Sequence, residues 1–300
     1  MESVVTHPLH GQRVVITGAN GWLGRELIAR LTCLGPDVEV LAITRQVLDP
    51  SFRKRQGVTS HTWDLDFIRN WQPTTFVHLA AVTKEYFHNA NHDQLLEINS
   101  GLTQSALKIA ELDSVKSVVL ASSGAAVMQL DHPYGIHKAR EEAAFKESCD
   151  RNGKNLIVSR IWSVSGKHCT KRNLLLFFDL IDQAQGPSES IVIGSRKKVL
   201  RRYVDGGEFL ELCLRVACAS RSATIDSEGE LIEAYDLADL IQRSLGTSKV
   251  IVFPANDMGQ DAYFSKSNTL REWEKLAGMY MSNLRTQIEI SAAFRADIRK

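Results

Sequence analysis

The feature that most constrains the fold is a glycine-rich turn near the N-terminus, within the segment RVVITGANGWLGRELIARL. An apolar, β-branched run leads into Gly18, Gly21 and Gly24, and leucines at helical spacing follow. The first glycine allows a tight turn, the second lets the backbone approach a pyrophosphate, and the third lets the helix pack closely on the strand. A helix N-terminus also offers free N–H groups and a partial positive charge to an anion. The segment therefore predicts a strand, a phosphate-binding turn and a helix.

The same alternation of strand and helix patterns continues through the first half of the chain, which is typical of a doubly wound parallel sheet with helices on both faces. Strands are predicted at Arg13–Thr17, Val38–Ile43, Thr75–Leu79, Ser117–Ala121 and Asn155–Ile161. After Gly166 the alternation weakens. A leucine-rich helix is predicted over Leu174–Ile181, then a strand near Ile191–Gly194, and then several helices to the C-terminus.

These patterns predict an α/β protein in which a Rossmann-like doubly wound parallel sheet carries a smaller C-terminal substrate-binding lobe. The sheet domain is expected over residues 1–166, with contributions from about 200–226, and the smaller lobe over residues 167–300. No linker separates the two parts, so we expect them to be interleaved.

Charge and composition narrow the class of partner. The chain has 36 Lys and Arg residues against 35 Asp and Glu residues, a formal net charge of +1. A nucleic-acid binder needs a large basic excess, so we expect small-molecule chemistry instead.

The five cysteines include no CxxC pair, and no set of ligand residues has metal-binding spacing, so neither a disulfide framework nor a metal site is expected. No apolar run approaches the roughly 20 residues of a membrane span and no N-terminal signal is evident, so the cytoplasm is expected.

Several further motifs follow the glycine-rich turn. TGANGWLG has the spacing TGxxGxxG. The later motifs are Asp64 in WDLD, HLAA at His78–Ala81, Asn99 in EINSGL, ASSGAA at Ala121–Ala126, YGIHK at Tyr134–Lys138, SRIWSVSG at Ser159–Gly166 and RRYVDGGEF at Arg201–Phe209. Over nearly its whole length the chain resembles the extended short-chain dehydrogenase/reductases, in particular their NAD(P)-dependent nucleotide-sugar epimerase/dehydratase branch.

The resemblance implies a bound nicotinamide dinucleotide. It assigns cofactor contacts to Gly18, Asn20, Gly21, Trp22, Leu23, Gly24, Asp64, Leu65, Leu79, Ala80, Ala81, Asn99, Tyr134 and Lys138. The choice between NAD and NADP is made after the second strand, where an acid holds the ribose 2′-OH and an arginine accommodates a 2′-phosphate. No acid follows VEVLAI, and Arg45 is the first side chain able to reach out. NADP(H) is therefore the preferred prediction, with NAD(H) as the alternative.

Proton transfer is predicted at Tyr134 and Lys138, which lie four residues apart and share one helix face if Pro133 opens the helix. A nearby ammonium favours the phenolate, and lowering the phenol pKa by three units needs roughly 4 kcal/mol. By resemblance, the tyrosine exchanges a proton with the substrate oxygen and the lysine holds the nicotinamide ribose. A hydroxyl beside them polarises the reacting group, with Ser123 the first candidate and Ser122 the second. An alternative alignment by the valine of AAV places Gly124 at that position.

Substrate contacts are expected at Ser123, Trp162, Ser163, Arg201 and Glu208. By resemblance, Arg201 grips a nucleotide diphosphate, and an arginine fork suits that group. Ser163 stands where the family has an asparagine, and the loop between the catalytic serine and tyrosine is short. Both departures weaken the sugar-nucleotide assignment without affecting the redox assignment.

The resulting prediction is an NADP-dependent 4-ketoreductase of a nucleotide sugar. Three alternatives stay open: a nucleotide-sugar 4-epimerase that retains its cofactor, a reductase of a non-sugar ketone, and a cofactor-sensing scaffold without catalysis. A 4,6-dehydratase is disfavoured because Gly124 and Ala125 replace the required acid pair. The family commonly forms homodimers through a four-helix bundle, and we expect this chain to do the same.

Overall fold

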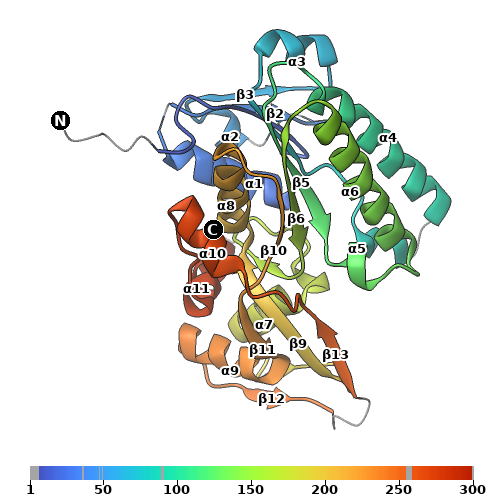
Figure 1. Ribbon diagram of the computed structural model, residues 1–300. Helices are drawn as coiled ribbons and strands as arrows, with labels where there is room; N and C mark the ends of the chain where they lie inside the picture. The colour runs from blue at the N-terminus through green and yellow to red at the C-terminus, as the bar shows by residue number, and fades with distance from the viewer. Residues whose placement is uncertain are drawn as a thin grey trace.

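The computed structural model describes residues 7–35, 37–46, 48, 50–88, 91–254 and 259–298, which form a larger and a smaller lobe (Figure 1). The larger lobe contains a seven-stranded sheet whose strands all pair in parallel, in the order β10-β6-β5-β4-β1-β2-β3. These strands are β1 (Arg13–Thr17), β2 (Glu39–Ile43), β3 (Val58–His61), β4 (Thr75–His78), β5 (Ser117–Ser123), β6 (Asn155–Ile161) and β10 (Ala223–Asp226). The strand order reverses between β1 and β4, which is where ligands bind in open α/β sheets.

Helices cover both faces of this sheet because alternate strand residues point to opposite sides. On β1, Val14 and Ile16 enter the core on one face, and Val15 enters the core on the other. The first face packs against α1 (Trp22–Cys33), α2 (Pro50–Arg53), α8 (Gly206–Cys218) and α10 (Leu270–Ala277). The second packs against α3 (Leu65–Trp71), α4 (His92–Ala110) and α6 (Pro133–Arg151). Near the carboxyl ends of the strands lie η1 (Lys84–His88) and α5 (Ala125–Met128), whose apolar residues form a small cluster with Tyr134.

The smaller lobe contains two further sheets and a core of its own. The first sheet joins β11 (Glu230–Glu233), β9 (Lys198–Asp205) and β13 (Gln260–Tyr263), and β7 (Val164–Ser165) also pairs with β9. The second pairs β8 (Ser190–Val192) with β12 (Val250–Val252). The helical elements of this lobe are η2 (Arg172–Leu174), α7 (Leu176–Gln185), α9 (Ala234–Leu245) and α11 (Leu284–Ile298). The three helices α7, α9 and α11 pack together, and Figure 1 shows them below the large sheet.

The chain passes between the lobes repeatedly. It leaves the large sheet after β6 to form β7, and it returns after β9 to form α8 and β10. It then enters the smaller lobe as β11, packs α10 against α8 of the larger lobe, and ends in α11 of the smaller lobe.

The predicted α/β class with a Rossmann-like sheet is confirmed, and all five predicted strands of the larger sheet are present. The sequence analysis missed β3 and β10, the two strands at the edges of the sheet. Several helices follow the strand near residue 191, as expected, namely α8, α9, α10 and α11. The sequence analysis did not predict the strands β9, β11, β12 and β13 that lie among them. In the described part of the chain, no helix combines the length and apolar character that crossing a membrane requires.

Candidate active site

The glycine-rich turn after β1 and the segment after β4 meet at the point where the strand order reverses. Gly18 has a φ of +69°, and a Cβ atom there would lie 2.7 Å from the backbone nitrogen of Ala80. A Cβ atom on Gly24 would lie 2.5 Å from the carbonyl oxygen of Gly18. Since real Cβ atoms do not approach backbone this closely, both positions require glycine for steric reasons. The turn is therefore held against the start of HLAA.

The N-terminus of α1 is suited to the pyrophosphate of a dinucleotide. Gly21 is the N-cap, and the first helical hydrogen bond runs from the Arg25 N–H to the Gly21 carbonyl. The preceding helical N–H groups therefore have no partner within the helix. The side chains of Trp22 and Leu23 are half-buried and pack against the protein core. Asn20 accepts hydrogen bonds from Arg25 through both its backbone and side-chain oxygens.

The remaining predicted cofactor residues lie on neighbouring strand ends. Asp64 caps α3 by accepting hydrogen bonds from the N–H groups of Asp66 and Phe67, and Leu65 begins that helix. Leu79, Ala80 and Ala81, all half-buried, follow β4, and the Leu79 N–H donates to the Thr17 carbonyl. Arg45 is exposed just beyond β2. Together these residues surround the carboxyl ends of β1, β2 and β4.

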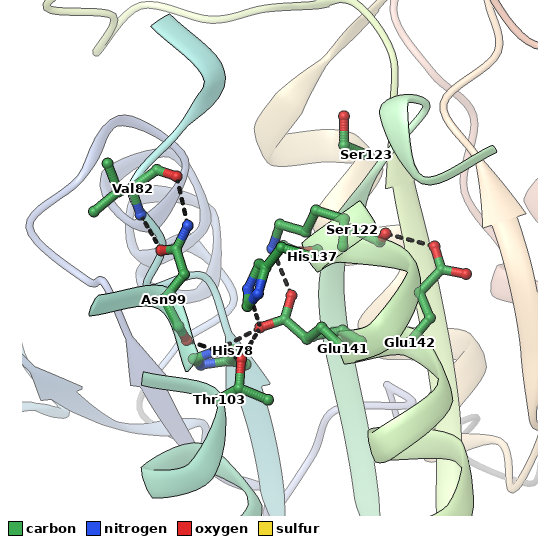
Figure 2. A network of polar contacts seen from close by, with 12 residues as sticks. His78, Val82, Asn99, Thr103, Ser122, Ser123, His137, Glu141 and Glu142 are labelled. Carbon is green, nitrogen blue, oxygen red and sulfur yellow. Dashed lines mark hydrogen bonds and ion pairs between the residues drawn. The ribbon is translucent and has the colours of Figure 1, made fainter. Parts of the chain in front are cut away.

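Asn99 acts as a buried clamp on the loop that follows HLAA. It is 1% exposed within α4, its side-chain oxygen accepts from the Val82 N–H at 2.7 Å, and its amide donates to the Val82 carbonyl at 3.0 Å (Figure 2). This side chain fixes backbone geometry and does not itself extend into an open site.

Tyr134 and Lys138 share one face of α6, as the sequence predicted. Pro133 lies in the first turn, and both side chains are buried. The Lys138 ammonium donates to the Ala121 carbonyl at 2.9 Å and to Glu141 at 2.6 Å. Burial raises the pKa of Tyr134 above its ordinary value, although the Lys138 charge opposes this. Burial alone would lower the pKa of Lys138, but Glu141, Tyr134 and Glu142 together outweigh burial and the net shift is upward.

Ser123 lies between two phenols. Its hydroxyl lowers the pKa of the Tyr134 phenol, and it lies 3.2 Å from the hydroxyl of Tyr263, a β13 residue of the smaller lobe. The Ala125 N–H also donates to the Ser123 oxygen. The Trp162 ring lies 5.1 Å from the Tyr263 ring and against Gly124. The structure thus brings Ser123 and Tyr134 together with the aromatic side chains of Trp162 and Tyr263. We call these two side chains the aromatic wall.

Ser122 faces away from this group. Its hydroxyl donates to Glu142 at 2.5 Å, and Arg160 binds the same carboxylate through two nitrogens at 2.9 and 2.7 Å. The hydroxyl of Ser122 is therefore engaged in a structural network, and of the two candidates Ser123 is the one beside Tyr134.

The predicted substrate residues separate into two places. Arg201 binds the Asp261 carboxylate at 3.0 Å, and its guanidinium lies 5.9 Å from the Tyr263 ring. Ser163 lies half-buried in the bend between β6 and β7. Glu208 does not join them, because it binds Arg30 of α1 and accepts from the Ser282 N–H at 2.7 Å. The structure thus gives the predicted acidic substrate contact a structural role instead.

A second buried group lies behind Lys138 and was not anticipated. Glu141 is 2% exposed and accepts from Thr103 at 2.8 Å, and two histidine nitrogens lie near it, His78 at 3.5 Å and His137 at 4.0 Å (Figure 2). Burial would raise the pKa of Glu141, but Lys138 and His78 hold it well below its usual range. In the sequence, Glu141 looks like a surface residue of a charged helix, so no local signal identifies it. The same holds for Tyr263, which lies 140 residues from Ser123.

Among the described residues, no three or more His, Cys, Asp or Glu side chains gather in a way that could hold a metal ion. The residues present do fit a nicotinamide dinucleotide. The glycine turn and helix N-terminus suit its pyrophosphate, and Lys138 has one N–H beyond the two used, which suits a ribose hydroxyl. The fold and site together define an NAD(P)-dependent enzyme of the short-chain dehydrogenase/reductase type.

Comparison with known sequences identifies the family. The sequence profile of the NAD dependent epimerase/dehydratase family matches residues 14–226, and the chain belongs to this family. A curated relative is the uncharacterized protein y4nL of Sinorhizobium fredii, 25% identical over 175 residues. That match covers 53% of this chain and 48% of the relative, so it spans about half of the relative's length.

Solved structures with the same fold include several enzymes of nucleotide sugars. UDP-glucose-4-epimerase from Stenotrophomonas maltophila, with bound NAD and formylated UDP-arabinopyranose, is 16% identical with a TM-score of 0.79, covering 96% of this chain and 99% of its own. UDP-N-acetylglucosamine 4-epimerase from Methanobrevibacter ruminantium is 17% identical with a TM-score of 0.77, covering 97% and 99%. UDP-glucuronic acid 4-epimerase from Bacillus cereus, in complex with NAD, is 16% identical with a TM-score of 0.74, covering 96% and 100%. At these identities the likeness establishes the fold.

Proposed function

We propose that this protein is a nucleotide-sugar 4-epimerase that uses a nicotinamide cofactor and exchanges a proton through Tyr134. The observation that carries the proposal is the placement of Ser123 beside Tyr134, with Lys138 one helical turn away on the same helix face. This group lies at the carboxyl end of β5, in the same sheet as the glycine-rich turn. The NAD dependent family and the 4-epimerases with the same fold support the choice of substrate and reaction.

The chain's residues have distinct parts in the proposed reaction. Tyr134 takes the proton from the sugar 4-hydroxyl and returns it to the 4-keto oxygen after the ring has presented its opposite face. Ser123 donates a hydrogen bond to the same oxygen, and Lys138 stabilises the phenolate. A bound nicotinamide would supply the site that takes up the hydride of the sugar C4 and returns it. Lys138 would hold the ribose of the cofactor through its remaining N–H.

The nucleotide diphosphate would be bound on the smaller lobe. Arg201 lies at the edge of the aromatic wall formed by Trp162 and Tyr263, and its side chain is 19% exposed. Its planar guanidinium suits a diphosphate. Because Asp261 holds it in the free protein, we expect the substrate to compete with that carboxylate for the arginine.

A second candidate is a 4-ketoreductase that uses NADP(H). Arg45 supports it, because an exposed arginine directly after β2, with no acid in its place, favours a 2′-phosphate. A reductase consumes its cofactor at every turnover, whereas an epimerase does not. NADP preference therefore favours the reductase, and equal or tighter binding of NAD favours the epimerase.

The test is an absorbance assay of NADH and NADPH with a panel of 4-hydroxy and 4-keto nucleotide sugars, together with chromatography of the products. We expect a 4-epimer to form without net cofactor consumption. Stoichiometric consumption would instead support the ketoreductase. Tyr134→Phe should lower kcat at least about 100-fold, because general acid–base groups contribute that much or more. The matched control Tyr280→Phe, on a side chain 67% exposed, should keep full activity. An active Tyr134→Phe protein would refute the proposed mechanism.

We further propose that two copies associate through the outer faces of α4 and α6, and that the protein works in the cytoplasm. A groove between these helices is lined by the apolar residues Leu96, Leu107, Ile136 and Ala144. The absence of disulfides among the five cysteines is consistent with a reducing compartment. Sedimentation equilibrium measures the assembly directly, and a monomer at micromolar concentration would exclude the proposed dimer.

A further inference from the structure

The buried carboxylate of Glu141 stands out because it neutralises the lysine beside the reacting phenol. The two groups are 2.6 Å apart, and both side chains are at most 4% exposed. Thr103 adds a hydrogen bond from α4, so the carboxylate is held by two different helices. Two charges this close and this well shielded from water act on their surroundings nearly as a dipole.

The charges around Tyr134 come from several elements. Lys138 and Glu141 lie on its own helix, Glu85 faces it from η1, and the Tyr263 phenol faces it from β13. Burial raises the pKa of Tyr134 most, Lys138 lowers it, and Glu85 and then Glu141 add to the rise. Glu141 in turn faces His78 on β4 and His137 on α6. Burial lowers the pKa of His137, which favours its neutral form and leaves the Lys138–Glu141 pair without that positive charge.

We propose that Glu141 is a positioning residue that acts as the counter-ion of Lys138 and keeps Tyr134 protonated while no cofactor is bound. The proposal rests on the proposed function, because it concerns the same tyrosine and lysine. If Glu141 has this role, Tyr134 of the cofactor-free enzyme is a neutral phenol rather than a phenolate, although Lys138 lies one helical turn away. Lys138 would then need a further positive charge beside it, such as that of an oxidised nicotinamide ring, to ionise the tyrosine.

The experiment measures the titration of Tyr134 in the free protein by NMR of tyrosine labelled with ¹³C at Cζ. The resonance is assigned by its loss in Tyr134→Phe. In the wild type the midpoint should lie above the ordinary value of about 10. Glu141→Gln should lower the midpoint by at least about one unit, a tenfold change in the acid constant. The matched control Glu147→Gln, on the same helix with a side chain 78% exposed, should leave it unchanged. An unchanged or raised midpoint in Glu141→Gln would overturn the proposal.

A second variant keeps the test decisive if Glu141→Gln fails to fold because Lys138 is left buried without its partner. The double variant Lys138→Met/Glu141→Gln removes both charges. If the two charges compensate each other, its midpoint should differ from the wild type by less than about one unit. A rise of more than about one unit would mean that Lys138 acts uncompensated, and would also overturn the proposal.

The titration separates this proposal from the proposed function. It needs neither substrate nor cofactor, so a protein without epimerase activity still reports the effect of Glu141. Conversely, normal epimerisation with an unchanged midpoint in Glu141→Gln would leave the function intact and remove only the counter-ion role.

Discussion

Replacing Glu26 by glutamine should stabilise the protein increasingly as the pH rises. Glu26 lies on α1 and is 5% exposed. Its carboxylate accepts hydrogen bonds from the Trp22 indole at 3.1 Å and from the His168 N–H at 2.6 Å. It also lies against Gly166, where a Cβ atom would come within 2.5 Å of it. A glutamine oxygen can accept the same two bonds, so the substitution mainly removes the charge.

The size of the effect follows from the shift of the Glu26 pKa, which burial, together with the Asp205 carboxylate, raises from 4.5 to about 7. Between these two values the unfolded chain has released the proton while the folded protein still holds it. Wild-type stability therefore falls as the pH rises through this window. At 1.36 kcal/mol per unit, the loss amounts to about 3 kcal/mol, and glutamine abolishes it.

Urea unfolding of the wild type and Glu26→Gln at pH 4.5, 6 and 8 measures the difference. All other titrating groups cancel in the comparison. The advantage of the variant should grow by about 3 kcal/mol between pH 4.5 and 8. Glu147→Gln, which removes an exposed charge by the same substitution, should show no such growth. A difference between Glu26→Gln and wild type that stays constant with pH would refute the reasoning.

Two substitutions in the core should also lower the free energy of unfolding. Gly124→Ala places a Cβ atom 2.3 Å from the Trp162 ring, which Asp226 holds at 3.0 Å, so overpacking should cost about 1–3 kcal/mol in urea unfolding. An unchanged midpoint would mean that the ring moves freely. Asn99→Ala leaves both backbone groups of Val82 without their side-chain partner, and should cost about 2 kcal/mol or more. Faster amide hydrogen exchange at Val82 would locate the effect, whereas unchanged exchange would contradict it.

The sequence predicted the parts of the fold that depend on local pattern. The glycine turn, the five inner strands of the large sheet and the Pro133 start of α6 each have a signal within a few residues. The strand β3 was missed because VTSH is short and only partly buried at the edge of the sheet, so it lacks an apolar run. In the smaller lobe, β9 is eight residues long but carries four charged residues, and β11 has only two apolar residues between two glutamates. Neither strand therefore shows a continuous apolar run.

The sequence predicted only those site residues that belong to a short motif. Tyr134, Lys138 and Ser123 follow from motifs, and the structure brings the tyrosine and the serine into contact. Tyr263 could not be found in this way, because its contact with Ser123 depends on the smaller lobe folding against the larger one. Glu141 is buried only because α4 and β4 cover it with residues distant in sequence.

The repeated passage of the chain between the lobes has consequences for proteolysis, for truncation and for the relative motion of the lobes. A protease that cuts once in a connecting segment therefore releases neither lobe. A truncated chain that keeps the edge strand β10 also keeps the elements from β7 to β9 that precede it in the smaller lobe. A movement of one lobe relative to the other must bend every connecting segment together, so we expect small concerted motions rather than a wide swing about one hinge.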